Sequence, residues 1–130
     1  MPAKSIEFLI DTDVIEDHLV CNCSKNNSYL ESLMLKGICF STVMNASELL
    51  YKSNSITEQK IIIDVLSALK ILGLHARYSL LVPKYSNFVK NINEALICVV
   101  ADYNKLPIVT LNKSKYSKCG LTIYHPSEIY

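Results

Sequence analysis

The feature that most constrains the fold is the alternation of short apolar runs with segments of helical periodicity. Apolar runs rich in strand-forming residues occupy positions 6–10, 38–43, 106–110 and 121–124. Because helical segments lie between most of these runs, the strands are expected to pair in parallel and to be covered by helices on both faces. The sequence therefore predicts an α/β protein, a three-layer α/β/α sandwich with a mainly parallel central sheet.

Length and composition restrict the class of protein further. The 130 residues are 50% hydrophobic and carry a net charge of +1, which suits one domain over residues 1–130 and excludes a strongly basic nucleic-acid binder. Any contact with phosphates must come from a local patch. The N-terminus has no apolar signal segment, and the longest apolar stretch, residues 95–101, is too short to cross a bilayer. We expect a cytoplasmic protein that does not contact a membrane.

Helix starts are indicated by a capping residue followed three positions later by an acid. Helical periodicity after the last such pair continues to Leu72 and predicts one long helix up to Gly73. Residues 74–93 predict a helical segment interrupted near Pro83, and residues 94–103 a well-buried helix. The capping pairs are Asp13 with Glu16, Ser28 with Glu31, Asn45 with Glu48, and Ser55 with Glu58.

Three acidic residues stand where an apolar run meets a helix start: Asp11, Glu48 and Glu94. Carboxylates are strongly hydrated and lie beside an apolar core mainly when they are paired or bind a cation. Parallel sheets place ligands at the carboxyl ends of their strands, where Asp11 and Thr110 are expected. A shared site for a hard metal ion, Mg²⁺ or Mn²⁺, follows from this placement.

Four segments of the sequence follow one another in the order found in one family of nucleases. They are the FLIDTDVI of residues 8–15, the STVMNASELLY of 41–51, the EALIC of 94–98 and the LPIVTLN of 106–112. These segments resemble the D-T-N-V opening, the second glutamate motif, the D-A-L-I-A and the L-P-L-V-T-x-N/D of PIN-domain nucleases, particularly VapC-type toxins. The similarity spans nearly the whole chain, and four ordered motifs are far more specific than one.

The resemblance implies a PIN-like fold and a metal-dependent endoribonuclease that hydrolyses RNA phosphodiester bonds as the toxin of a toxin–antitoxin pair. Its implied partners are RNA, a small antitoxin protein that places an apolar peptide in a surface groove, and a second copy of the chain. The ion is Mg²⁺ or Mn²⁺, which activates water for attack on phosphorus. The implied site consists of catalytic and metal-binding Asp11, Glu48 and Glu94, with Asn112 as a further metal residue and Thr110 and Asp13 in support.

Two positions depart from the family pattern. Glu94 stands where the family usually has aspartate, and Lys115 replaces the final acid ahead of Tyr116. Asn112 holds the other candidate position for a fourth acid, so the usual quartet is reduced to three carboxylates and an amide. A second interpretation is therefore a catalytically weakened PIN fold that binds RNA or protein. A third is a housekeeping RNA-processing nuclease.

Each site residue also has a purely structural interpretation. Asp11 is a strand-end acid that can cap the next helix, Glu48 can complete a capping box with Asn45, and Glu94 suits a helix start through the helix dipole. Asp13, where the family commonly has asparagine, is expected to be a cap rather than a ligand. The three lysines of the last motif either contact substrate phosphates or belong to a solvated loop. They are Lys113, Lys115 and Lys118.

Overall fold

A computed structural model describes residues 6–21 and 27–129 of the chain, and its centre is a five-stranded sheet. The strands lie in the order β3-β2-β1-β4-β5, and every neighbouring pair is parallel. The predicted parallel sheet is confirmed. The strand bounds are β1 Glu7–Ile10, β2 Ile38–Thr42, β3 Lys70–Leu72, β4 Ile108–Val109 and β5 Ile123–Tyr124.

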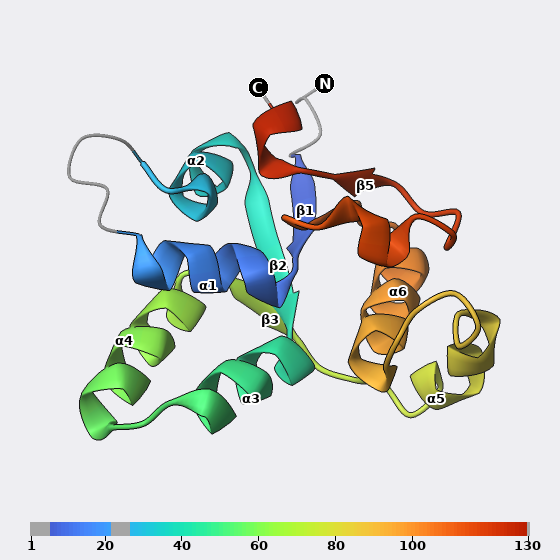
Figure 1. Cartoon of the computed structure of the whole chain (residues 1–130), viewed down its shortest axis with the longest axis horizontal. Helices are drawn as coiled ribbons and strands as arrows, with labels where there is room; N and C mark the ends of the chain where they lie inside the picture. Colours follow the sequence, from blue (N-terminus) through green and yellow to red (C-terminus); the bar gives the residue numbers. More distant parts are fainter. Residues whose placement is uncertain (1–5, 22–26, 130) are drawn as a thin grey trace, which may run out of the picture.

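Helices cover both faces of this sheet, which confirms the predicted three-layer α/β/α sandwich (Figure 1). One face carries α1 (Thr12–Val20), α2 (Tyr29–Lys36), α3 (Val43–Lys52) and α4 (Ile56–Ser67). The opposite face carries α5 (Tyr78–Leu81) and α6 (Ile92–Asn104). Short 3-10 turns complete the described chain: η1 Val82–Lys84, η2 Lys113–Tyr116 and η3 Pro126–Glu128.

The first strand shows how the sheet divides the core. Phe8 and Ile10 pack against the α1–α4 layer, whereas Leu9 between them packs against the α5–α6 layer. All three side chains are buried because successive residues of a strand point to opposite faces and both faces are covered. Burying a side chain of this size contributes about 1.5–3 kcal/mol. This strand is the one at whose end the candidate site lies.

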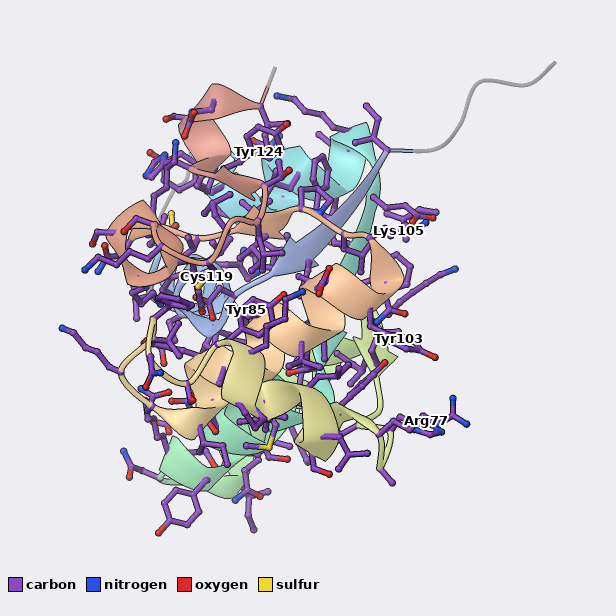
Figure 2. The ribbon with its side chains drawn as sticks, turned by 90° about the vertical axis from the view of Figure 1, so that its right-hand side faces the viewer. Arg77, Tyr85, Tyr103, Lys105, Cys119 and Tyr124 are labelled. Atoms are coloured by element: carbon purple, nitrogen blue, oxygen red, sulfur yellow. The ribbon has the colours of Figure 1, made fainter. Side chains whose placement is uncertain are left out.

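On the α5–α6 face, the buried side chain of Tyr85 bonds to helix α6. Figure 2 looks onto this face, with Arg77 and Tyr103 at its outer edge and Tyr85 against α6. The Tyr85 hydroxyl donates a 2.8 Å hydrogen bond to Oδ2 of Asp102, which also accepts from Nζ of Lys84 at 3.1 Å. Burial, together with Asp102, raises the pKa of Tyr85 and keeps the hydroxyl protonated. The segment that follows η1 is thereby fixed to α6.

Two of the predicted helix caps are confirmed. The Ser28 hydroxyl accepts a hydrogen bond from the backbone amide of Glu31, and the Ser55 hydroxyl accepts one from the amide of Glu58. In addition, the Glu58 carboxylate accepts from the amide of Asn54. Each pair therefore satisfies amides that have no partner within the helix.

Asp13 and Asn45, the caps that the spacing predicted for α1 and α3, are wrong, whereas the interpretation of Asp11 as a cap is confirmed. Helix α1 is capped by Asp11, which follows β1 directly, and not by Asp13. Helix α3 is capped by Thr42, so Asn45 lies inside the helix. In both cases the helix begins within two residues of the end of the strand, because the end of the strand fixes the extended backbone that a cap requires.

The long helix predicted up to Leu72 is also wrong. Helix α4 ends at Ser67, and Lys70–Leu72 forms β3, which pairs with β2 in the register Phe40↔Lys70. An edge strand satisfies this backbone through β2, and that gain outweighs the local helical spacing. The segment around Pro83 is helical and interrupted, as predicted. Along the described chain, the helices lack the length and hydropathy that a membrane span requires.

Gly37, at the end of α2, provides a test of how closely α2 and β1 approach. A Cβ at this position would collide with the backbone carbonyl oxygen of Ile6 and lie 2.9 Å from the carbonyl carbon. We predict that Gly37→Ala lowers the free energy of unfolding by about 1–3 kcal/mol in urea titrations, because backbone must move to accept the methyl group. Gly73→Ala is the control, since no atom lies within 4 Å of its Cβ. Equal effects would contradict the close approach.

Candidate functional site

The carboxyl ends of β1 and β4 define the place where a ligand is expected. From β1 the sheet extends in one direction through β2 to β3, and in the other through β4 to β5. Ligands bind at such a reversal of strand order in open parallel sheets. Ile10 pairs in register with Val109, so Asp11 and Thr110 emerge side by side. The sequence predicted both residues for this edge.

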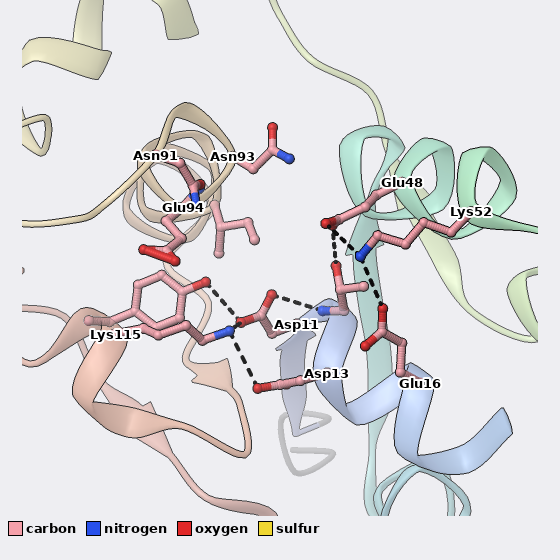
Figure 3. Close-up of a pocket in the computed structure, with 12 residues that line it drawn as sticks. Asp11, Asp13, Glu16, Glu48, Lys52, Asn91, Asn93, Glu94 and Lys115 are labelled. Atoms are coloured by element: carbon pink, nitrogen blue, oxygen red, sulfur yellow. Dashed lines mark hydrogen bonds and ion pairs between the residues drawn. The ribbon is translucent and has the colours of Figure 1, made fainter. Parts of the chain in front are cut away.

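A polar cavity of about 170 Å³ opens at this point (Figure 3). It brings together all four of the predicted carboxylates, Asp11, Asp13, Glu48 and Glu94, from three separate segments. Glu16 adds a fifth carboxylate that the site prediction lacked, although it lies one helical turn after Asp13. The remaining lining residues are Thr12, Lys52, Asn91, Asn93, Ile97, Lys115 and Tyr116.

Asp11 is the most buried of the acids, with 3% of its surface exposed. Its Oδ1 accepts the backbone amide of Thr12 at 2.8 Å, which is the cap of α1. Its Oδ2 accepts Nζ of Lys115 and the hydroxyl of Tyr116, both at 2.8 Å. Burial and the adjacent Asp11 charge raise the pKa of Tyr116, which therefore stays a donor. Asp11 thus caps helix α1 and pairs with the ammonium group of Lys115 at the same time.

Glu48 points into the cavity from α3. Its Oε2 accepts a hydrogen bond from the Thr12 hydroxyl at 3.2 Å, and its Oε1 lies 3.4 Å from Nζ of Lys52. The same ammonium group lies 3.7 Å from Glu16 on α1 (Figure 3). The alternative in which Glu48 forms a capping box with Asn45 is wrong, because Thr42 caps α3.

A buried polar network beneath Glu48 fixes its direction. The Asn45 amide accepts from the Thr12 hydroxyl at 2.8 Å and donates to Ser41 Oγ at 3.0 Å and to the carbonyl of Ile10 at 3.2 Å. These bonds fasten α3 to the end of β1. Site prediction from the sequence missed Thr12, Ser41 and Asn45, although all three lie within the motif segments. Contacts between a strand and a helix, or between distant segments, leave no periodic signal in the sequence.

Asp13 joins α1 to the end of β4 instead of capping α1. Its Oδ2 accepts from the Thr110 hydroxyl at 2.7 Å and from the amide of Leu111 at 3.1 Å, and lies 3.4 Å from Nζ of Lys115. Its Oδ1 is buried and has no hydrogen-bond partner among the described residues. An unsatisfied buried carboxylate oxygen is costly, and it is a position where a cation or a water molecule gains a ligand.

Glu94 satisfies the start of α6. Its carboxylate accepts the amide of Lys90 at 3.1 Å, and its own amide donates to Oδ1 of Asn91 at 2.9 Å. This geometry agrees with the helix-start interpretation of Glu94. The same side chain lines the acidic cavity on the side opposite Glu48 (Figure 3). A role in capping therefore does not remove Glu94 from the site.

The predicted residues of the last motif take different positions. Lys115 bridges Asp11 and Asp13, and this pairing raises its pKa although burial alone would lower it. Lys113 forms a 2.8 Å ion pair with Glu128. Asn112 is exposed, bonds to Ser114, and does not line the acidic cavity. Both Asn112 and Lys118 line a neighbouring hollow.

Comparisons with known proteins agree with the architecture. Neither a protein-family model nor the sequence of a curated protein matches the chain. Among solved structures, VapBC2 of Rickettsia felis, bound to promoter DNA, aligns with TM-score 0.75 and 18% identity over 92% of this chain and 98% of its own. VapBC-1 of nontypeable Haemophilus influenzae aligns with TM-score 0.75 and 12% identity, over 94% of this chain and 99% of its own. A Klebsiella pneumoniae toxin–antitoxin complex aligns with TM-score 0.73 and 12% identity, over 92% of this chain and 97% of its own.

The chain has the VapC-type PIN-domain fold. At these identities the similarity concerns the fold, and the residues of the site must be judged by their own geometry. The PIN-like architecture expected from the four motifs is confirmed. The carboxylates of Asp11, Glu48 and Glu94 lie around one cavity of this PIN fold.

The donor chemistry of the PIN-fold cavity suits Mg²⁺ or Mn²⁺. Both ions prefer carboxylate oxygen, and Oδ1 of Asp13 is buried without a partner. However, across residues 6–21 and 27–129 no three acidic, histidine or cysteine side chains converge on one metal position. The ammonium group of Lys115 already offsets part of the negative charge of Asp11 and Asp13. A divalent ion at these oxygens would therefore compete with the Lys115 ammonium group.

Lys115→Met tests this competition, because methionine keeps the length of the side chain and removes its charge. In EDTA we predict a loss of about 1–3 kcal/mol in unfolding free energy, since Asp11 and Asp13 lose their counter-charge. Added Mg²⁺ should then raise the melting temperature of the variant more than that of the native protein. Lys113→Met removes an exposed pair and is the control. An equal Mg²⁺ response in all three proteins would contradict the competition.

Proposed function

We propose that the chain is a metal-dependent endoribonuclease that hydrolyses RNA phosphodiester bonds and acts as the toxin of a toxin–antitoxin pair. The observation that carries this proposal is the gathering of five carboxylates around one cavity at the end of β1 and β4. They come from the first two α/β units and from α6, which are distant in sequence. Such a concentration of hard oxygen ligands suits an ion that binds phosphate.

The residues of the cavity divide into ligands and supports. Asp11, Asp13 and Glu48 offer oxygen ligands, and Glu94 completes the opposite wall. When bound, Mg²⁺ or Mn²⁺ supplies activation of a water molecule and neutralisation of charge at phosphorus. The hydroxyl of Tyr116 holds Asp11 in place through its 2.8 Å bond. Thr12 and Thr110 orient Glu48 and Asp13 by hydrogen bonds to their carboxylates.

An apolar groove supports the proposed antitoxin partner. Leu19 and Val20 at the end of α1 and Ile61 and Ile62 of α4 line a hollow of about 280 Å³. The Val20 side chain is 76% exposed, which is unusual for an apolar residue beside other apolar residues. A small apolar segment of an antitoxin would cover this groove. A second copy of the chain as partner and a cytoplasmic location stay predictions.

A second candidate function is a PIN fold that binds RNA or protein without cleaving RNA. The observation in its favour is the 2.8 Å contact between Lys115 and Asp11, where the family pattern has an acid in place of lysine. If the ammonium group holds Asp11 permanently, this carboxylate keeps a counter-charge without a divalent ion. The two functions differ in one measurable property, metal-dependent cleavage.

Cleavage of RNA by the purified protein in Mg²⁺, in Mn²⁺ and in EDTA tests the proposed function. We predict cleavage with either ion and none in EDTA. Glu48→Gln should lower the rate about 10- to 100-fold while the melting temperature changes little, because glutamine can still accept from Thr12 but carries no charge for a metal. Asp11→Asn should lower the rate at least as much.

The matched control for these variants is Asp64→Asn on α4, which removes a carboxylate outside the cavity. It should cleave RNA at the native rate. In a bacterial host, expression of the native chain without an antitoxin should slow growth, whereas Asp11→Asn at matched expression should not. Native cleavage by Glu48→Gln, or cleavage that persists in EDTA, would contradict the metal role.

A further inference from the structure

A second hollow adjoins the acidic cavity, and its charged lining residues are basic. It measures about 330 Å³ and lies between the segment 87–90 that leads into α6 and the segment 112–118 around η2. Lys115 lines both this hollow and the acidic cavity. The two hollows therefore share the residue that contacts Asp11.

The charges of this second hollow favour an anion. Lys90, Lys115 and Lys118 line it, and no carboxylate is among its described lining residues. Within residues 6–21 and 27–129, the ammonium groups of Lys90 and Lys118 have no ion-pair partner. Unpaired lysines at a concave surface bind phosphate oxygens well, because few competing protein anions must be displaced.

An exposed aromatic ring stands beside these lysines. Phe88 lines the same hollow, and 48% of its surface is exposed although it sits next to buried Tyr85. Unpaired RNA bases stack on exposed aromatic rings, and single-stranded binding sites combine such rings with lysines that follow the backbone. The amides of Asn87 and Asn112 at the same surface offer hydrogen bonds to sugar and base edges.

Both walls of the hollow are held in place before any ligand binds. The wall with Phe88 follows Tyr85, whose hydroxyl bonds to Asp102 of α6. The wall with Lys118 is fixed by the bond from Tyr116 to Asp11, and just beyond it Sγ of Cys119 lies 3.5 Å from Sγ of Cys98. A preformed surface loses less conformational entropy on binding than a flexible one.

From these observations we infer that the hollow between residues 87–90 and 112–118 binds single-stranded RNA. Lys90 and Lys118 hold backbone phosphates, Phe88 stacks a base, and the strand reaches the acidic cavity at Lys115. The inference rests on the proposed function for the identity of the ligand and extends it by assigning the binding surface. Asn112, which the sequence predicted as a metal residue, would then contact the RNA and not the metal ion.

Binding of a fluorescent single-stranded RNA, measured by anisotropy in EDTA at several salt concentrations, tests the inference without requiring cleavage. The double variant Lys90→Ala/Lys118→Ala should weaken binding at least about tenfold. The slope of log affinity against log salt should fall by about 1.4, because each phosphate contact to a single strand contributes about 0.7. Phe88→Ala should weaken binding by about fivefold or more and leave the slope unchanged.

The control Lys60→Ala/Lys70→Ala removes the same charge from α4 and β3, away from the hollow, and should bind RNA as the native protein does. Equal losses in the two double variants, native affinity in Lys90→Ala/Lys118→Ala, or no binding of RNA by the native chain would overturn the inference. Binding that depends on the hollow in a protein without metal-dependent cleavage would support this surface and reject the nuclease proposal. The two failures are therefore distinguishable.

Discussion

The buried carboxylate of Asp11 is the constraint on which the site depends. A charge at the end of β1 with 3% of its surface exposed is stable only with several donors, and it has three: the amide of Thr12, the ammonium of Lys115 and the hydroxyl of Tyr116. These bonds join β1, α1 and η2 at one point. The reversal of strand order between β1 and β4 creates the space, and Asp11 organises the residues around it.

Lys115 places a positive charge of the chain itself inside the acidic cavity. Its position at 2.8 Å from Asp11 and 3.4 Å from Asp13 gives the cavity a cation supplied by the chain itself. The Lys115 side chain is partly exposed and its four-carbon stem is flexible, which leaves a path for the ammonium group to leave Asp11. It also lines the basic hollow next to the cavity. Under the proposed function, transfer of the ammonium group from Asp11 to an RNA phosphate would free the carboxylates for a divalent ion when the RNA binds.

Local chemistry explains what the sequence predicted well. The caps Ser28 and Ser55 are decided within four residues, and the apolar runs of the strands are decided by burial on both faces. The caps of α1 and α3 depend instead on where a strand ends, and β3 exists only because β2 offers it a pairing partner. In the site, the sequence motifs correctly placed the carboxylates of Asp11, Glu48 and Glu94 around one cavity. The bond between Lys115 and Asp11 spans 104 positions of sequence, and spacing carries no information on such a contact.

A crystal structure with Mn²⁺, examined by anomalous scattering, would show whether the cavity at the end of β1 binds a divalent ion through Asp11 and its neighbours after Lys115 withdraws. We expect an anomalous peak within ligand distance of Asp11 and of at least one of Asp13 or Glu48, with the Lys115 ammonium group no longer on Asp11. Absence of a peak in this cavity at saturating Mn²⁺, with Lys115 still bonded to Asp11, would contradict it.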